Sequence, residues 1–103
     1  MYSHPQQGAG AEAHKLRQEA GQWLKALREA RGLSQREFAR LIPVDYYTFI
    51  SQIESGRGRI PPERYEAWAR ALAVDVKDFV RTLMSYYDPI TYGILFEHTD
   101  RRA

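Results

Sequence analysis

A series of short amphipathic segments, each ended by a residue that stops a helix, most constrains how this chain can fold. From residue 11 to residue 87, apolar side chains recur at intervals of three and four, which is the spacing of one face of an α-helix. Glycine or proline interrupts this pattern at Gly32, Pro43, Gly56 and Pro61. Glycine readily ends a helix, and proline disfavours helical geometry in the residue before it. The sequence therefore predicts an all-α fold, a small bundle of five or six helices.

Polar residues at the starts of these segments indicate the helix boundaries. Ser34 and Glu37 have the spacing of a capping box, in which each side chain accepts a hydrogen bond from the other residue's amide. Asp45 and Asp75 are suited to cap the helices that follow them, because a carboxylate accepts bonds from the free amides of the first turn. The helices expected from these signals span residues 11–31, 35–42, 46–55, 62–73 and 76–87.

The two ends of the chain differ from this middle part. Residues 1–10 contain one proline and two glycines and show no periodicity, so we expect a flexible N-terminal leader. Residues 88–103 form a C-terminal extension. Asp88 followed by Pro89 is a typical helix start, which predicts a short helix over residues 90–96. The β-branched and aromatic side chains of that segment are also compatible with a strand.

Length and composition indicate one ordinary domain. The chain has 103 residues, of which 44% are hydrophobic and 27% are charged, so a packed core is expected. It contains no cysteine, which excludes a disulfide framework and a thiolate zinc site. No apolar run approaches the roughly 20 residues of a membrane-spanning helix, and residues 1–15 lack the apolar core of a signal peptide. We therefore expect a cytoplasmic protein without a membrane partner.

The sequence contains no pattern that indicates an enzyme. The three histidines, His4, His14 and His98, lie near the two ends of the chain, without the spacing of a shared metal site. There is no nucleophile-and-base pattern and no glycine loop that could hold a phosphate. We therefore expect a non-enzymatic protein with no metal site, no catalytic residues and no cofactor.

Two short helices joined by a turn, residues 35–42 and 46–55, describe a helix-turn-helix within the bundle. Three runs carry a family resemblance: LKALREARGLSQREFARLI at 24–42, YTFISQIESG at 47–56 and YEAWARALAV at 65–74. With them the sequence resembles the Cro/cI-like, or XRE-type, helix-turn-helix regulators of bacteria and phages. This resemblance covers about residues 22–79 and implies a lambda-repressor-like DNA-binding domain, which we expect to span residues 11–87. It also implies a regulator of transcription that binds double-stranded DNA sequence-specifically.

The resemblance also assigns roles to single residues. Gln35 matches the family's glutamine that contacts a phosphate or supports a base-reading side chain. Ala39 matches the small residue that allows the two motif helices to pack closely, and Ile50 and Ile53 match apolar positions of the recognition helix. Glu54 and Gly56 match the glutamate and the helix-ending glycine that follow it. Pro43 replaces the glycine that usually enters the turn, and the turn is one residue longer. This difference leaves the register of the base-reading positions open by one residue.

Helical periodicity divides residues 46–55 into two faces. Tyr46, Phe49, Ile50 and Ile53 form the predicted buried face. Gln52 can bond bidentately to adenine, and the Thr48 methyl group can contact that of thymine. The predicted base-reading residues are Tyr47, Thr48, Ser51 and Gln52. The alternative is an ordinary solvated helix face, although the absence of lysine and glutamate between Tyr46 and Ile53 argues against it.

Arginine is the main source of positive charge, with twelve arginines against three lysines in a chain of net charge +2. Its planar fork binds phosphate or guanine bidentately, whereas lysine acts as a point charge. The predicted phosphate-contacting residues are Gln35, Arg36, Arg57 and Arg59. The alternative for the last two is a solvated loop that pairs its charges with Glu54 or Glu63.

The end of the chain concentrates large apolar side chains. The predicted contact residues for a second chain are Tyr86, Tyr87, Tyr92, Leu95 and Phe96. Such a patch packs on its own core or on a partner. We expect a homodimer, because a twofold pair would read two half-sites roughly 34 Å apart. The alternative is a DNA-binding antitoxin, or another protein-interaction module, that covers a partner protein with this segment.

Overall fold

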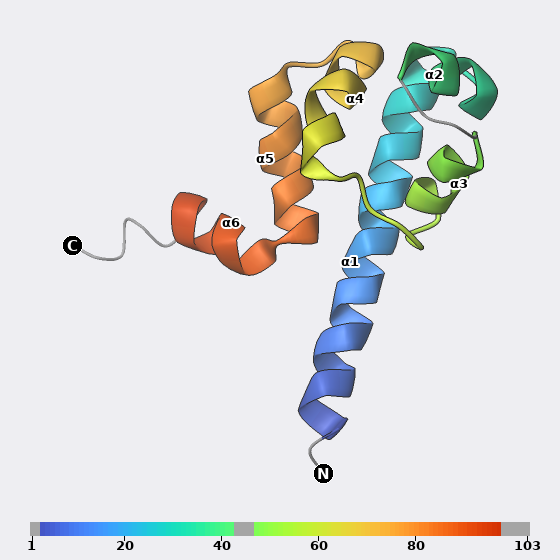
Figure 1. Ribbon diagram of the computed structural model, residues 1–103. Helices are drawn as coiled ribbons and strands as arrows, with labels where there is room; N and C mark the ends of the chain where they lie inside the picture. Colours follow the sequence, from blue (N-terminus) through green and yellow to red (C-terminus); the bar gives the residue numbers. More distant parts are fainter. Residues whose placement is uncertain (1–2, 43–46, 98–103) are drawn as a thin grey trace.

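The described residues, 3–42 and 47–97 of this computed structural model, form six α-helices and no strand (Figure 1). The helices are α1 (Ser3–Ala30), α2 (Gln35–Leu41), α3 (Thr48–Glu54), α4 (Tyr65–Leu72), α5 (Val76–Tyr87) and α6 (Pro89–Phe96). A short 3₁₀ helix, η1 (Pro62–Arg64), leads into α4. The prediction of a small all-α bundle is therefore confirmed.

The predicted capping box starts α2. The Glu37 amide donates to the Ser34 hydroxyl at 3.0 Å, and the Ser34 amide donates to a Glu37 carboxylate oxygen at 2.8 Å. These bonds from Ser34 lower the pKa of Glu37, because they favour its charged form. Before the box, Gly32 has a φ of 73°, the left-handed conformation that glycine adopts freely, and α1 ends there as predicted.

Aspartates cap the last two helices. The Asp75 carboxylate accepts from the Asp78 amide at 3.0 Å, and that of Asp88 accepts from the Thr91 amide at 3.4 Å. Pro89 occupies the first turn of α6, where its missing N–H removes no helical bond. The segment 90–96 is therefore helical, and the strand that its composition also allowed does not form.

The start of α1 corrects the prediction for the N-terminal end. The predicted leader covers residues 1–10, whereas α1 is already helical from Ser3. Apolar periodicity arises where one face of a helix is buried, so it does not indicate a helix that projects beyond the core. Figure 1 shows the first part of α1 extending away from the other helices. Glutamine and alanine are good helix formers and allow the helix to continue despite Gly8 and Gly10.

The start of α3 also differs from the prediction, which placed the helix at 46–55 with Asp45 as its N-cap. The first helical bonds run to the Tyr47 carbonyl, from the amides of Ile50 at 2.9 Å and Ser51 at 3.4 Å. Tyr47 is therefore the N-cap, without a side-chain capping bond, and α3 spans Thr48–Glu54. Asp45 and Tyr46 lie outside the described residues.

The core lies between α1 and the shorter helices around it. Figure 1 shows α4 and α5 on one side of α1, and α2 and α3 on the other. Phe38 of α2 meets Trp68 of α4 edge to face, with ring centroids 4.9 Å apart. The largest fully buried side chains are Trp68, Phe38, Phe79, Leu24, Ile50, Ile53, Ile60 and Leu83. Because α1 contacts both α3 and α5, it fixes α3 against the rest of the bundle.

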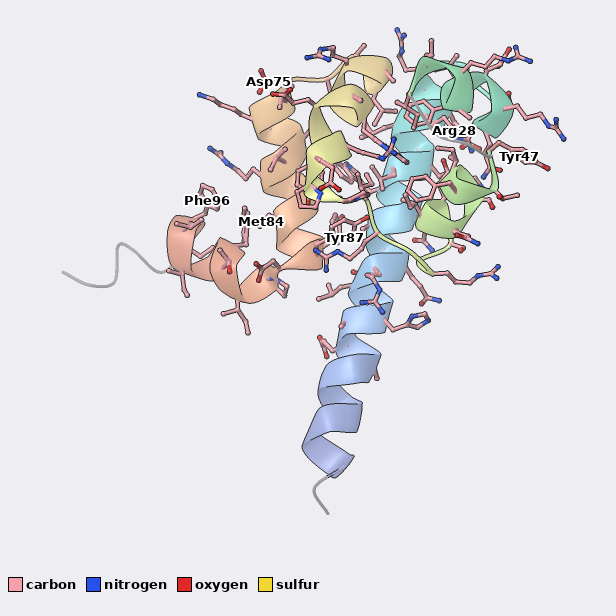
Figure 2. All side chains as sticks on the ribbon, viewed as in Figure 1. Arg28, Tyr47, Asp75, Met84, Tyr87 and Phe96 are labelled. Atoms are coloured by element: carbon pink, nitrogen blue, oxygen red, sulfur yellow. The ribbon has the colours of Figure 1, made fainter. Side chains whose placement is uncertain are left out.

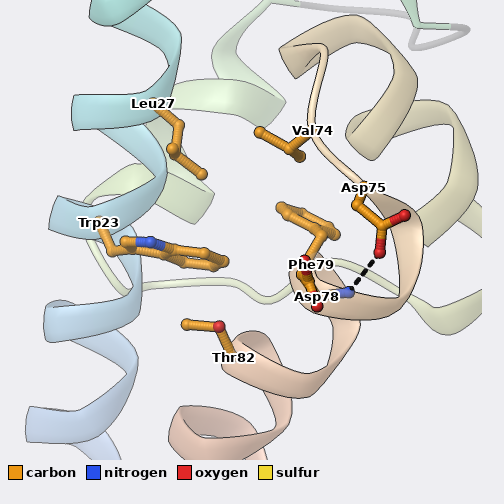
Figure 3. Close-up of a pocket in the computed structure, with 7 residues that line it drawn as sticks. All are labelled: Trp23, Leu27, Val74, Asp75, Asp78, Phe79 and Thr82. Atoms are coloured by element: carbon orange, nitrogen blue, oxygen red, sulfur yellow. Dashed lines mark hydrogen bonds between the residues drawn. The ribbon is translucent and has the colours of Figure 1, made fainter.

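A hollow of about 310 Å³ lies between α1 and α5 (Figure 3). Trp23 of α1 stacks on Phe79 of α5 there, with ring centroids 5.5 Å apart. The Asp75 carboxylate at its edge is the cap of α5 described above. The stack of Trp23 on Phe79 therefore joins α1 to α5.

Within residues 3–42 and 47–97, no helix has both the length and the apolar character needed to cross a membrane.

Candidate nucleic-acid interface

The end of α3 is fixed by a buried ion pair with α1. Arg28 donates through Nε to one Glu54 carboxylate oxygen at 2.6 Å and through Nη2 to the other at 3.0 Å. Its Nη1 donates to the Leu33 carbonyl at 2.6 Å. The side-chain Nε2 of Gln35 donates to Glu54 Oε1 at 3.0 Å. The hydrogen bond to Glu54 raises the pKa of Arg28 above its ordinary value. One carboxylate thus joins α1, α2 and α3.

Two glycines allow α1 and the end of α3 to approach each other closely. A Cβ atom on Gly21 would lie 2.1 Å from the Glu54 carbonyl oxygen, so only glycine fits this crossing. Gly56 has a φ of 86°, and a Cβ there would lie 2.7 to 2.9 Å from atoms of Gln18. Gly56 therefore ends α3 as predicted and also lies directly against α1.

The two faces of α3 are as the periodicity predicted for the described residues. Ile50 and Ile53 are buried and Phe49 is half-buried. Thr48, Gln52 and Tyr47 are exposed on the opposite side. Ser51 is half-buried, and its hydroxyl donates to the Thr48 carbonyl at 2.9 Å. The helix therefore presents a small polar surface, without a charged side chain, on a rigid apolar base.

The two predicted phosphate-contacting residues of α2, Gln35 and Arg36, differ in burial and in the groups that they contact. Gln35 is half-buried, and one of its amide hydrogens is engaged by Glu54, so it supports the end of α3. Arg36 is exposed and lies over the ring of Tyr47, with its guanidinium carbon 4.3 Å from the ring centroid. The structure thus brings Arg36 next to a predicted base-reading residue.

The loop after α3 carries the other two predicted phosphate contacts. The amides of Arg57 and Gly58 donate to the Gln52 carbonyl at 2.9 and 3.1 Å, which holds the loop against the end of α3. The Arg57 side chain is exposed. Arg59 lies over the Tyr87 ring, 4.5 Å from its centroid. Glu54, one of the two carboxylates expected as alternative partners of these charges, is bonded to Arg28 instead.

Tyr87 anchors this loop to the end of α5. Its hydroxyl accepts a hydrogen bond from the Ile60 amide at 3.1 Å. Burial raises the pKa of Tyr87 above its ordinary value, because the ionised phenol loses hydration there. Tyr86 packs on Trp23, with ring centroids 5.9 Å apart. Two of the five predicted contact residues for a second chain therefore pack within their own chain.

The other three predicted contact residues lie on α6. Tyr92 and Phe96 contact each other, with ring centroids 5.1 Å apart, and Arg81 lies over Phe96 at 4.8 Å. Leu95 and Phe96 remain exposed, as do Ile90 and Ile94 on the same helix. Ile90, Ile94, Leu95 and Phe96, together called the α6 surface, are thus four large apolar side chains exposed to solvent on one short helix.

Sequence analysis missed two residues that position α3, namely Arg28 and Gly21. Arg28 lies four residues after buried Leu24, so a charged side chain falls on the apolar stripe of α1. Gly21 stands inside a helix, where glycine is unfavourable by about 1 kcal/mol relative to alanine. Both anomalies are visible in the sequence and indicate a buried partner and a close approach.

The described residues contain no group of three or more histidine, cysteine or acidic side chains arranged to hold a metal ion.

Comparison with known proteins gives one family. A family model described as a helix-turn-helix domain, of the XRE/Cro-like type, matches residues 19–83, from the middle of α1 into α5. A search of curated proteins and a search of solved structures each return no match.

Proposed function

Because this chain belongs to the helix-turn-helix domain family, we propose that it is a sequence-specific regulator of transcription that reads double-stranded DNA with α3. The outward face of α3 is the observation that carries the proposal. Thr48 and Gln52 are exposed there, while Ile50, Ile53 and the Arg28–Glu54 pair fix the helix from behind. A helix of this kind enters a major groove and presents its side chains to base edges.

In the proposed complex, Gln52 bonds to the N6 and N7 positions of an adenine, and the Thr48 methyl group contacts a thymine methyl group. The Tyr47 hydroxyl and the Ser51 oxygen accept or donate further bonds at the edges of this contact. Phosphate contacts from Gln35, Arg57 and Arg59 position the protein on the duplex without reading its sequence. A protein with this activity acts in the compartment that holds the DNA, so the proposal includes a cytoplasmic location.

Selection of genomic DNA fragments bound by the intact chain tests this proposal. Recurrent enrichment of one sequence is the expected result, with affinity for that sequence falling as salt concentration rises, because phosphate contacts release counterions. Recovery of random fragments only, at any salt concentration, would contradict it. The recovered sequence also gives the symmetry of the site.

We also propose that the regulator is a homodimer that pairs through the α6 surface. The seven residues of α3 can contact only a few base pairs, and a twofold pair doubles the sequence that is read. Ile90 is 76% exposed and Ile94 is 56% exposed, which is unusual for side chains of this size. Beside them, a hollow of about 380 Å³ is lined by Leu16, Tyr86 and Pro89 among others, and it offers apolar surface to a second copy.

A further inference from the structure

The contact between Arg36 and Tyr47 crosses from one motif helix to the other. Arg36 lies in the first turn of α2, and Tyr47 directly precedes α3. The Arg36 guanidinium carbon is 4.3 Å from the Tyr47 ring centroid, within the range of a cation–π interaction. Figure 2 shows the Tyr47 side chain projecting outward at the edge of the molecule formed by α2 and α3. The stacked pair therefore lies beside the proposed reading face.

Among the residues that the structure describes, the carboxylates at the start of α2 and at the end of α3 are engaged elsewhere. Glu37 is engaged by the Ser34 amide, and Glu54 by Arg28 and Gln35. Within the part of the chain that the structure describes, Arg36 has no salt bridge and no side-chain hydrogen bond. Stacking uses the face of a guanidinium, whereas its N–H groups lie along the edge. Arg36 is exposed while its guanidinium carbon lies over the Tyr47 ring, so its N–H groups are within reach of a ligand.

We infer that Arg36 and Tyr47 form one recognition unit, in which Tyr47 positions Arg36 and Arg36 reads a guanine of the operator. The inference rests on the proposed function. A guanidinium edge matches the O6 and N7 acceptors of guanine, which is the commonest specific contact in a major groove. The contact with Tyr47 holds the Arg36 guanidinium at the start of α3, so the guanidinium keeps a fixed position relative to that helix. Holding it there also reduces the rotamer entropy that binding would remove.

The guanine reading differs from a phosphate contact in its dependence on side-chain shape. A lysine keeps the charge that attracts phosphate, but it lacks the planar fork that binds guanine and stacks on tyrosine. The variants R36K and Y47L remove the fork and the ring, respectively, while Y47F keeps the ring. Because Arg36 is exposed and Tyr47 is 38% exposed, we expect all three variants to fold with unchanged thermal unfolding.

The experiment measures competition binding of the intact chain to its selected duplex and to duplexes with each base pair replaced in turn. Wild type should prefer one G·C pair by roughly 5- to 150-fold. R36K and Y47L should lose this preference at that pair alone, and Y47F should keep it. R70K is the matched control, since Arg70 is an exposed arginine of α4 that pairs with Glu66, and it should match wild type.

Two results overturn the inference in distinguishable ways. If R36K binds the duplex and keeps the wild-type preference at every base pair, Arg36 is a phosphate contact and the recognition unit does not exist, although the proposed function stands. If wild type shows no base preference on any duplex, the proposed function fails, and the inference fails with it.

Discussion

Both oxygens of the Glu54 carboxylate, in the last turn of α3, accept hydrogen bonds from the guanidinium of Arg28 in α1, at 2.6 and 3.0 Å. The two side chains are buried, at 7% and 5% exposure. A buried ion pair adds little net stability over an apolar pair, but removal of one partner leaves an uncompensated charge. The pair therefore acts mainly to specify where α3 lies on α1, which the proposed function requires.

Loss of Arg28 alone should destabilise the fold strongly. We expect R28M to lower the free energy of unfolding by about 3–5 kcal/mol, because Glu54 stays buried without its partner. The double variant R28M/E54L replaces the pair by apolar side chains and should recover most of this loss. Urea unfolding, followed by circular dichroism, measures both values. Equal unfolding midpoints for R28M and wild type would show that the pair does not hold α3.

Gly21 should tolerate no side chain. A Cβ atom would lie 2.1 Å from the Glu54 carbonyl oxygen, so the backbones of α1 and α3 must separate in G21A. We expect a loss of about 1–3 kcal/mol in unfolding free energy and weaker DNA binding. Gly10 provides the control, because nothing lies within 4 Å of its Cβ position, and G10A should stabilise the helix by up to about 1 kcal/mol. Similar stability for both variants would contradict the close crossing.

Tyr87 should make stability fall at high pH. Burial raises its pKa in the folded state above the ordinary value of about 10. Its contribution is therefore complete below about pH 10 and is lost as pH rises further, since the unfolded chain releases the proton first. Y87F should unfold with less dependence on pH as the pH rises above about 10. It should also lose about 0.5–1.5 kcal/mol at neutral pH, through the missing bond to the Ile60 amide. An identical pH profile for the two proteins would refute the burial effect.

The α6 surface should determine whether the protein is a monomer or a dimer in solution. We expect a dimer for wild type by light scattering, and a monomer for L95K, because a charge would then face the apolar interface. Leu95 is 51% exposed, so the variant should fold normally. The control, K25A, removes an exposed charge of α1. A monomeric wild type, both free and on DNA, would rule out the homodimer.

Local signals predicted most of the helix boundaries. Ser34 with Glu37, Asp75 with Asp78, and Gly32 act through bonds or dihedrals within a few residues, so the sequence displays them directly. The buried face of α3 was also predictable, because helical periodicity follows from burial. These signals suffice for the fold and for the side of α3 that faces outward.

Contacts between distant residues could not be predicted in the same way. The Arg28–Glu54 pair joins residues 26 apart, and its partner choice depends on how α1 crosses α3. The stacking of Arg36 on Tyr47 likewise depends on the position of α3 relative to α2. The first part of α1 extends away from the other helices, so no periodicity marked it. Sequence therefore predicted which residues are candidates for the site, and the structure shows which of them lie together.

The central claim is that the outward face of α3 reads DNA, and the base preference of Q52A tests it most directly. Wild type and Q52A are compared on the selected duplex and on duplexes with each base pair replaced. Q52A should fold normally, keep its nonspecific affinity, and lose about 1–3 kcal/mol of discrimination at one A·T pair. R57A should instead weaken binding to all duplexes and reduce the salt dependence. Unchanged discrimination by Q52A at every base pair would contradict the account.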